Sequence, residues 1–186
     1  MASLTIRPLK AADVDLVLSY WAAATPADLE RMGVDPTKLP GPDQMRAGLL
    51  KLLETPETQT PAFYMLWLVD GKPIGYTSLK GIIFGERGDM HLHIWDSACR
   101  GKGYGAVLFC KAALDFFERF KLRSIICEPG AMNPMPNGML KHVGFRLLGS
   151  RIGASSELSK VCELNTYDIA RDVAERYLKE IANERR

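Results

Sequence analysis

The chain has 186 residues, of which 47% are hydrophobic and 25% charged, and its formal net charge is +2. This length and composition favour a single domain, residues 1–186, with one sizeable core. The near balance of charge gives no support for a nucleic-acid or membrane surface, and the sequence has neither a membrane-length apolar run nor a signal-peptide core. We therefore expect a cytosolic protein, monomeric or homodimeric, with no nucleic-acid or membrane partner.

The first half of the chain predicts two helices and an antiparallel meander. Asp70 and Gly71 form a two-residue turn signal, because both residue types tolerate positive φ. Residues 25–42 are rich in proline and charge and are expected to be irregular. The predicted elements are a strand at 4–7, helices at 11–24 and 43–53, and strands at 63–69, 73–84 and 90–96.

The second half alternates between helices and strands. In the predicted helix 104–120, apolar side chains recur every three or four residues. The further elements are a strand at 124–127, a helix at 134–143 closed by Gly144, strands at 145–150 and 161–169, and a helix at 170–183. The order predicts an α/β (α+β) fold with a mixed, mostly antiparallel sheet flanked by helices.

The four cysteines are far apart and form no C-x-x-C pair. This spacing argues against a zinc site and against a disulfide framework. We expect small, largely buried side chains and no metal. The four are Cys99, Cys110, Cys127 and Cys162.

A glycine-rich loop stands between a predicted strand and a predicted helix. Its alternate glycines let the backbone approach a ligand, and a helix N-terminus favours an anion such as pyrophosphate. A tight connection without a ligand is the other interpretation of such a loop. Its residues are Arg100, Gly101, Lys102, Gly103, Tyr104 and Gly105, with Arg100 and Lys102 supplying positive charge.

Two nucleotide motifs compete for this loop, and neither fits. A dinucleotide fingerprint would follow the first strand of a parallel βαβ unit and precede an acidic residue about 20 positions on, whereas this loop follows an antiparallel meander. The nearest acidic candidate, Glu128, precedes a proline. The Gly-Lys-Ser/Thr ending of a P-loop is absent.

Arg-x-x-Gly-x-Gly, formed by Arg100, Gly103 and Gly105, is similar to the coenzyme A pyrophosphate loop of the GNAT superfamily of N-acetyltransferases. Downstream, the spacing of Asn133, Leu140 and Gly144-Phe145 resembles the second signature of that superfamily, and the order of elements from 4 to 168 resembles its fold. The resemblance implies an acetyl-coenzyme A-dependent enzyme that moves an acetyl or short acyl group to a small-molecule or peptide amine by direct attack on the thioester.

The resemblance also implies which residues hold the cofactor. The strand before the loop would expose backbone N–H groups of Ile94, Trp95 and Asp96 to the thioester. Asn133 would contact the pantetheine arm, and Asn137, one turn later, would share that face. Asn133 is also a natural helix N-cap, so a purely structural role stays open.

The proton acceptor has two candidates. His93 shares one face of its strand with His91 and Trp95 by two-residue alternation, and a histidine is a reasonable general base. Glu128 ends the next strand and is the second candidate. Structural roles are equally open for all of these side chains.

No general acid is assigned, because Leu140 stands where many GNAT members carry a tyrosine. This leucine resembles the branch that acetylates ribosomal-protein N-termini. A non-catalytic acyl-coenzyme A sensor and a siderophore-type acyltransferase remain alternatives, although Gly130 replaces the acidic residue of the latter. The acceptor pocket is expected around residues 25–42, with five candidate side chains: Trp21, Asp28, Glu30, Arg31 and Asp35.

Overall fold

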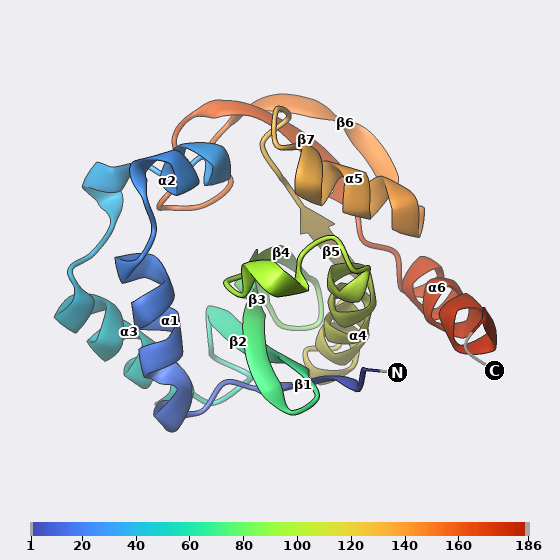
Figure 1. Ribbon diagram of the computed structural model, residues 1–186, viewed down its shortest axis with the longest axis horizontal. Helices are drawn as coiled ribbons and strands as arrows, with labels where there is room; N and C mark the ends of the chain where they lie inside the picture. The colour runs from blue at the N-terminus through green and yellow to red at the C-terminus, as the bar shows by residue number, and fades with distance from the viewer. Residues whose placement is uncertain (1, 185–186) are drawn as a thin grey trace.

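The computed structural model describes residues 2–184, whose strands form one seven-stranded sheet in the order β1-β2-β3-β4-β5-β7-β6 (Figure 1). All neighbouring strands are antiparallel except the parallel pair β4 and β5. The mixed, mostly antiparallel sheet is therefore confirmed. The strands are β1 (Leu4–Pro8), β2 (Ala62–Val69), β3 (Lys72–Ile83), β4 (Arg87–Ile94), β5 (Ser124–Cys127), β6 (Arg146–Gly153) and β7 (Cys162–Asp168).

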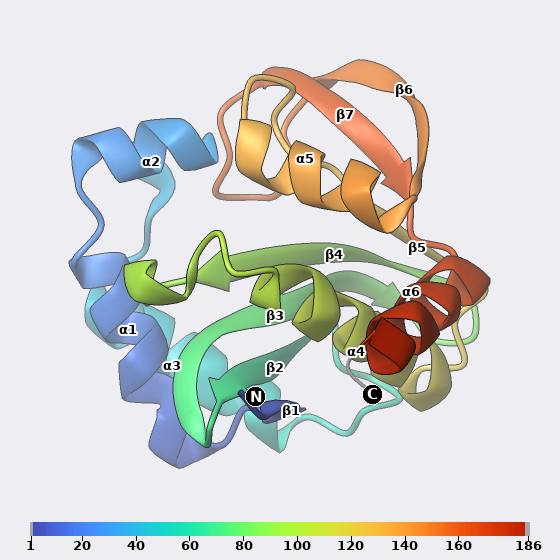
Figure 2. The ribbon, with the colours of Figure 1, turned by 45° about the vertical axis from the view of Figure 1, so that its right-hand side comes forward.

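Helices cover both faces of the sheet, with α1 and α3 on one side and α4 with α6 on the other (Figure 2). Alternate residues of β2 enter the two cores: Met65 and Trp67 pack with α4, while Leu66 packs with α1 and α3. The helices are α1 (Val14–Ala22), α2 (Pro26–Met32), α3 (Pro42–Glu54), α4 (Tyr104–Arg119), α5 (Pro134–Val143) and α6 (Arg171–Glu184).

The hairpin between β2 and β3 forms as the sequence predicts. Asp70 and Gly71 have φ values of 49° and 77°, so both central residues adopt the left-handed conformation of a tight two-residue turn. On the far side of the sheet, α4 buries an apolar face that includes Val107, Cys110 and Phe117. These side chains fix the N-terminus of α4 next to the end of β4.

The expectation of an irregular segment at 25–42 is wrong, because this segment contains α2. Thr25 caps the helix: its hydroxyl accepts a hydrogen bond from the N–H of Asp28, while the Asp28 carboxylate accepts one from the N–H of Thr25. Pro26 occupies the first turn, and Gly33 ends the helix at φ 69°. These local signals outweigh the high proline and charge content of the segment.

The parallel pair of β4 and β5 covers only three residues of each strand. Arg87 to Asp89 pair with Ser124 to Ile126, after which the strands separate. β4 continues along β3 to Ile94, while β5 pairs instead with β7. One edge of β4 is thereby left without a neighbouring strand, and this opening faces the N-terminus of α4.

Candidate active site

The loop between β4 and α4 is shaped as an open cradle. Gly101 and Gly103 have φ values of 72° and 75°, a conformation that side chains disfavour, and no atom lies within 4 Å of a Cβ built at either glycine. Gly103 is the N-cap of α4, so the first N–H groups of the helix point out of the loop. Lys102 is exposed beside them. Free N–H groups, a helix N-terminus and a cation suit a pyrophosphate.

The exposed edge of β4 offers fewer peptide N–H groups than the sequence predicts. The N–H groups of Trp95 and Asp96 both donate to the carbonyl of Ile74 on β3, at 3.0 and 3.2 Å. The expectation that they face a thioester is therefore wrong. Because successive peptide groups of a strand point to opposite edges, the N–H of Ile94 points to the open side. Ile94 is the member of this trio that can donate to a ligand there.

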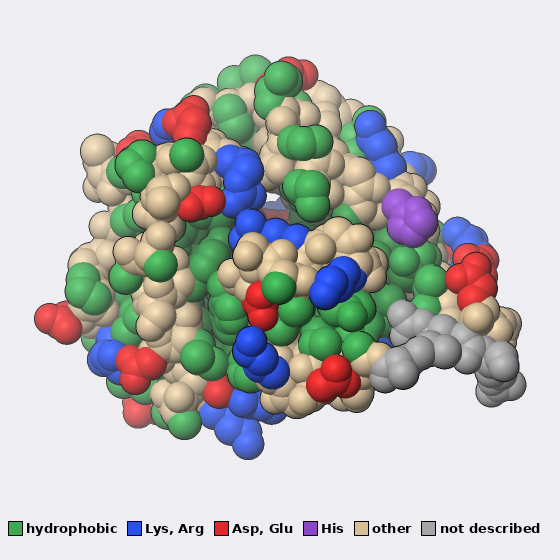
Figure 3. Space-filling view, in the orientation of Figure 1, with side chains coloured by type: hydrophobic (Ala, Val, Ile, Leu, Met, Phe, Trp, Pro, Cys, Tyr) green, Lys and Arg blue, Asp and Glu red, His purple; other side chains and the backbone are tan. Residues whose placement is uncertain are grey.

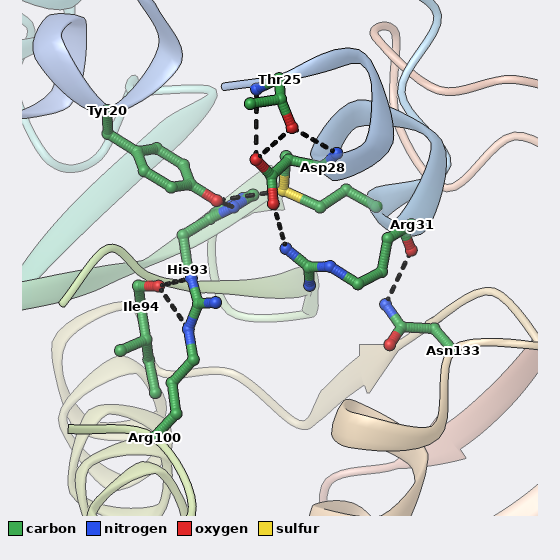
Figure 4. A network of polar contacts seen from close by, with 9 residues as sticks. Tyr20, Thr25, Asp28, Arg31, His93, Ile94, Arg100 and Asn133 are labelled. Carbon is green, nitrogen blue, oxygen red and sulfur yellow. Dashed lines mark hydrogen bonds and ion pairs between the residues drawn. The ribbon is translucent and has the colours of Figure 1, made fainter. Parts of the chain in front are cut away.

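Arg100 connects the loop to the end of β4. Its Nε and Nη2 donate to the carbonyl oxygen of Ile94 at 3.2 and 2.6 Å (Figure 4). The positive guanidinium at this carbonyl holds the last peptide of β4 in place while the side chain remains exposed. Arg100 therefore lies between the loop and the open edge of the strand, where it can reach an anion as well.

The two asparagines of α5 differ in their surroundings. Asn133 stands at the N-cap but makes no capping hydrogen bond; instead its Nδ2 donates to the carbonyl of Arg31 on α2, 3.1 Å away (Figure 4). Its buried Oδ1 has no hydrogen-bond partner among residues 2–184. Asn133 thus connects α5 to α2.

Asn137 does not share this exposed face. It is 6% exposed, and its Nδ2 donates to the carbonyls of Gly130 and Asn133 at 2.9 and 2.7 Å. Its Oδ1 accepts hydrogen bonds from Asn165 and Tyr167 at 2.8 and 3.2 Å. The prediction that Asn137 lines the pantetheine arm is therefore wrong, because every polar atom of its side chain is committed to the protein. The Asn137 side chain thus links the turn before α5 to β7.

His93 lies on the face of β4 that points away from α4, in a cluster of aromatic rings. It stacks on Tyr76 with centroids 4.9 Å apart and makes edge contacts with Tyr20 and Trp21. The Tyr20 hydroxyl lies 3.2 Å from its Nδ1 (Figure 4). Burial is the largest cause that lowers the pKa of His93, to about 3, and His91, Lys80 and Arg31 add to it. The imidazole is therefore neutral at pH 7.

His91 and His93 share one face of β4, as their alternation predicts. His91 lies opposite Ser78 on β3, and its Nε2 is buried with no hydrogen-bond partner in the described part of the chain. Burial lowers the pKa of His91 to about 4, so this ring is neutral as well. Two adjacent neutral imidazoles line this side of the sheet.

Glu128 is held in a salt bridge. Arg151 on β6 contacts both carboxylate oxygens, with its Nε 2.7 Å from Oε1, and the Thr166 hydroxyl donates to Oε1 at 2.6 Å. The hydrogen bond from Arg151 is the largest cause that lowers the pKa of Glu128. Taking up a proton would weaken this pair.

A hollow of about 340 Å³ lies between α1, α2 and the loop after β4. Figure 3 shows a hollow near the centre of one face with basic side chains beside it, and the basic residues that line the hollow are Arg31 and Arg100. Arg31 is held there by Asp28, whose Oδ1 is 3.1 Å from its Nη2. The hydrogen bond from Thr25, followed by that from Arg31, lowers the pKa of Asp28 to about 2. The lining residues are Leu16, Ser19, Tyr20, Ala23, Ala24, Asp28, Arg31, Trp95 and Arg100.

A larger cavity of about 590 Å³ lies between α1, α3, β3, β4 and the connection from β6 to β7. Trp21 lines it as expected, and His93 contributes to its floor. Of the remaining acceptor candidates, Glu30 pairs with Lys160, and Asp35 accepts hydrogen bonds from Thr37. Those two carboxylates stabilise the surface of the α2 segment.

Sequence reasoning missed Tyr20, which contacts His93 and lines the hollow. Its only sequence signal is its place beside Trp21 at the end of a helix. The described residues hold no group of His, Cys, Asp and Glu side chains arranged for a metal ion. No helix in the same residues has the length and hydropathy needed to span a membrane.

Comparison with known proteins agrees with the observed fold. The family model described as an acetyltransferase (GNAT) domain matches residues 3–146. A ribosomal-protein alanine acetyltransferase from Vibrio fischeri superposes with a TM-score of 0.71 at 20% identity, covering 91% of this chain and 93% of its own. A search of curated proteins found no sequence match.

Two structures with bound coenzyme A have the same fold. RimL, a ribosomal-protein N-acetyltransferase, gives a TM-score of 0.74 at 16% identity and covers 92% of this chain and 96% of its own. A spermidine N-acetyltransferase from Vibrio cholerae, in complex with coenzyme A and spermine, gives 0.72 at 17% identity, covering 92% and 98%.

Proposed function

The chain belongs to the GNAT acetyltransferase family, and from this premise we propose that it transfers an acetyl or short acyl group from acyl-coenzyme A to an amine. The observation that carries the proposal is the open cradle of residues 100–105 next to the unpaired edge of β4. A ligand that bears a pyrophosphate at one end and a narrow arm at the other fits this combination.

The loop residues would hold the pyrophosphate. The backbone of Gly101 to Gly105 supplies N–H groups, and Lys102 adds charge at the helix N-terminus. Tyr104, at the first position of α4, lies among the same groups. The arm would follow the gap between β4 and β5 toward Asn133, whose free Oδ1 suits an amide N–H. When bound, acyl-coenzyme A supplies the activated thioester.

The N–H of Ile94 would stabilise negative charge on the reacting carbonyl oxygen. A peptide donor at the end of a strand is already oriented, so the donation costs little rearrangement. Arg100 supports this role because it holds the carbonyl of the same residue. The remaining N–H groups of the trio are bonded to β3 and contribute only to the shape of the strand end.

His93 would accept the proton of the attacking amine. With its low pKa it is unprotonated throughout the neutral range, so its free nitrogen is always available. It is too weak a base to deprotonate a free alkylammonium ion. The nitrogen becomes a far stronger acid as its bond to the acyl carbon forms, and at that stage a weak base is sufficient.

The acceptor would enter from the face of the sheet that carries His93, opposite α4. The cavity between α1, α3 and the connection from β6 to β7 leads to this histidine, whereas the cofactor groups lie at the loop and the open edge of β4. Amine and thioester would therefore meet at the end of β4 from opposite sides.

The test is release of free thiol from acetyl-coenzyme A in the presence and absence of amines. The proposal expects saturable, amine-dependent release with equimolar N-acetylated product. Failure to bind coenzyme A in a calorimetric titration would overturn it.

A second candidate function, a non-catalytic acyl-coenzyme A sensor, is favoured by one observation. Leu140 is fully buried in the core, so α5 supplies no acid for the leaving thiolate at this position. Saturable binding of acetyl-coenzyme A without turnover of any amine would support the sensor over the enzyme.

A further inference from the structure

The floor of the larger cavity is built from successive cross-strand pairs of β3 and β4. Tyr76 lies opposite His93, and Ser78 lies opposite His91, one pair farther from the end of β4. All four line the cavity. Side chains two residues apart on one face of a strand are about 7 Å apart. The floor therefore changes from aromatic rings at the reacting end to hydrogen-bonding groups about 7 Å away.

The walls above this floor are largely apolar. They come from α1, α3, β2, the end of α2 with the connection that follows it, and the connection from β6 to β7. The cavity volume of about 590 Å³ is suited to a small organic molecule. The apolar and aromatic lining residues are Val17, Trp21, Met32, Val34, Pro40, Met45, Leu49, Leu52, Tyr64 and Leu158. A flat apolar body would be buried on both sides here.

Among the described residues, the cavity lining has no unpaired carboxylate that could bind a second positive charge on an acceptor. Glu157 is the only acidic residue among its lining residues, and its Oε1 is 2.8 Å from Nζ of Lys80. The other charged lining residue is Lys38, which donates to the carbonyl of Ser159 at 2.8 Å. A polyamine or an aminoglycoside would bring several cations into a cavity whose own formal charge is already positive.

His91 provides an independent observation. Its side chain lines the cavity, and its Nε2 is buried and has no hydrogen-bond partner in the described residues. A buried polar atom without a partner costs free energy, and a ligand group that bonds to it removes that cost. A neutral imidazole can donate or accept at Nε2 according to its tautomer, so a hydroxyl group, which does both, is the matching partner.

We propose that the acceptor is a monoamine with an apolar, aromatic-sized body and one uncharged hydrogen-bonding group at the end remote from the amine, as in tyramine. The amino group lies beside His93 and Tyr76, the body lies under α1 and α3, and the remote hydroxyl meets His91 and Ser78. This inference rests on the proposed acyl transfer and specifies its substrate class.

The first test compares acceptors with acetyl-coenzyme A and the full chain. Tyramine, phenethylamine, spermidine and kanamycin are assayed for kcat/KM. Tyramine is expected to exceed spermidine and kanamycin at least about tenfold, and to exceed phenethylamine by about five- to tenfold because of the remote hydroxyl. Spermidine or kanamycin as the best acceptor would overturn the inference and leave acyl transfer intact.

The second test removes the proposed hydroxyl partners. His91→Phe keeps an aromatic ring of similar size, and Ser78→Ala is a milder change on the same cross-strand pair. Both are expected to bring the tyramine to phenethylamine ratio of kcat/KM near 1. An unchanged ratio in the correctly folded Ser78→Ala variant would contradict the proposed placement of the hydroxyl.

The third test adds a charge. Ser155→Asp places a carboxylate in the cavity lining and is expected to raise kcat/KM for spermidine relative to tyramine at least about fivefold. If no amine is turned over, calorimetry separates the failures. Coenzyme A binding without tyramine binding to the loaded protein would overturn this inference alone, and loss of coenzyme A binding would overturn the proposed function.

Discussion

The Tyr20 hydroxyl lies 3.2 Å from Nδ1 of His93 and 3.0 Å from the sulfur of Met32, so it joins α1, β4 and the end of α2. When the hydroxyl donates to the sulfur, Nδ1 of His93 donates to the phenol oxygen. The imidazole is then fixed in the tautomer whose Nε2 carries the lone pair, which is the form that a proton acceptor needs. Tyr20 acts in this arrangement as a positioning residue.

Replacing these two residues separates positioning from proton transfer. His93→Ala is expected to lower kcat about a hundredfold with coenzyme A binding kept, because it removes the proposed proton acceptor. Tyr20→Phe should lower kcat by only about three- to tenfold with little change in acceptor KM, because the ring packing remains. Steady-state kinetics at saturating acetyl-coenzyme A measure both effects.

His93→Asn is the matched control, because its amide can keep a hydrogen bond to Tyr20 but offers no nitrogen at the position of Nε2. It should be as slow as His93→Ala. Full activity of His93→Asn would show that the histidine only positions Tyr20.

The two neutral histidines make a specific prediction for stability against pH. Both pKa values fall from the ordinary 6.5, to about 4 for His91 and about 3 for His93. Between these values and 6.5 the unfolded chain binds more protons than the folded one, so stability is complete above pH 6.5 and declines as the pH falls. The limiting slope is about 1.4 kcal/mol per pH unit for each histidine.

Urea unfolding at pH 7.5, 6.0 and 5.0 measures this decline. The double variant His91→Gln with His93→Gln should be much less sensitive over the same range. Glu128 acts in a lower range: its pKa is held below the ordinary 4.5, so its contribution is lost only as the pH falls below that value. Equal stability of the wild-type chain at pH 7.5 and 5.0 would contradict the burial of neutral histidines.

A glycine outside the cradle, Gly85, has nearly the same backbone conformation as Gly103 and is the control for testing the cradle. Gly85, in the turn between β3 and β4, has φ 79° against 75° for Gly103, and a Cβ would meet no atom within 4 Å at either position. Alanine at each costs about 1–2 kcal/mol of backbone strain. Gly103→Ala alone is expected to weaken coenzyme A binding, by about tenfold or more, because its Cβ would enter the cradle.

Calorimetric titration with coenzyme A and thermal unfolding measure the two effects separately. Similar losses of Tm in the two variants with loss of affinity only in Gly103→Ala would support the cradle. Equal affinities in both variants would place the cofactor elsewhere.

The asparagines of α5 predict opposite phenotypes. Asn137→Ala removes four hydrogen bonds and leaves buried partners such as Tyr167 without one, so a loss of about 2–4 kcal/mol is expected in urea unfolding. Asn133→Ala removes one hydrogen bond to Arg31 and should cost less than about 1 kcal/mol. Asn133→Ala should instead raise the KM for acetyl-coenzyme A. A larger stability loss at Asn133 than at Asn137 would reverse these roles.

Much of the fold could be predicted from local sequence signals. The continuous apolar and aromatic run of β2, the Asp70-Gly71 turn and the apolar face of α4 each depend on residues close in sequence. The α2 helix has a local cap, the reciprocal hydrogen bonds of Thr25 and Asp28, but the proline and charge content of residues 25–42 obscures this signal in the sequence.

The candidate site could be predicted only in part. The glycine loop is contiguous, and its shape follows from its glycines. The surroundings of His93 come from α1, β3 and β4, so neither its neutral state nor its contact with Tyr20 has a local signal. The pairing of Glu128 with Arg151 joins β6 to the end of β5, and it has no local sequence signal either. The bonding of the Trp95 and Asp96 N–H groups to Ile74 depends on the register of β3 and β4.

The central claim is that acyl-coenzyme A bound at residues 100–105 reacts with an amine that enters beside His93. The most direct measurement is the rate of thiol release from subsaturating acetyl-coenzyme A with tyramine, compared among the wild-type chain, Gly103→Ala and Gly85→Ala. We predict amine-dependent release that falls at least about tenfold in Gly103→Ala and changes less than about twofold in Gly85→Ala. Amine-independent release, or equal rates in all three proteins, would contradict the claim.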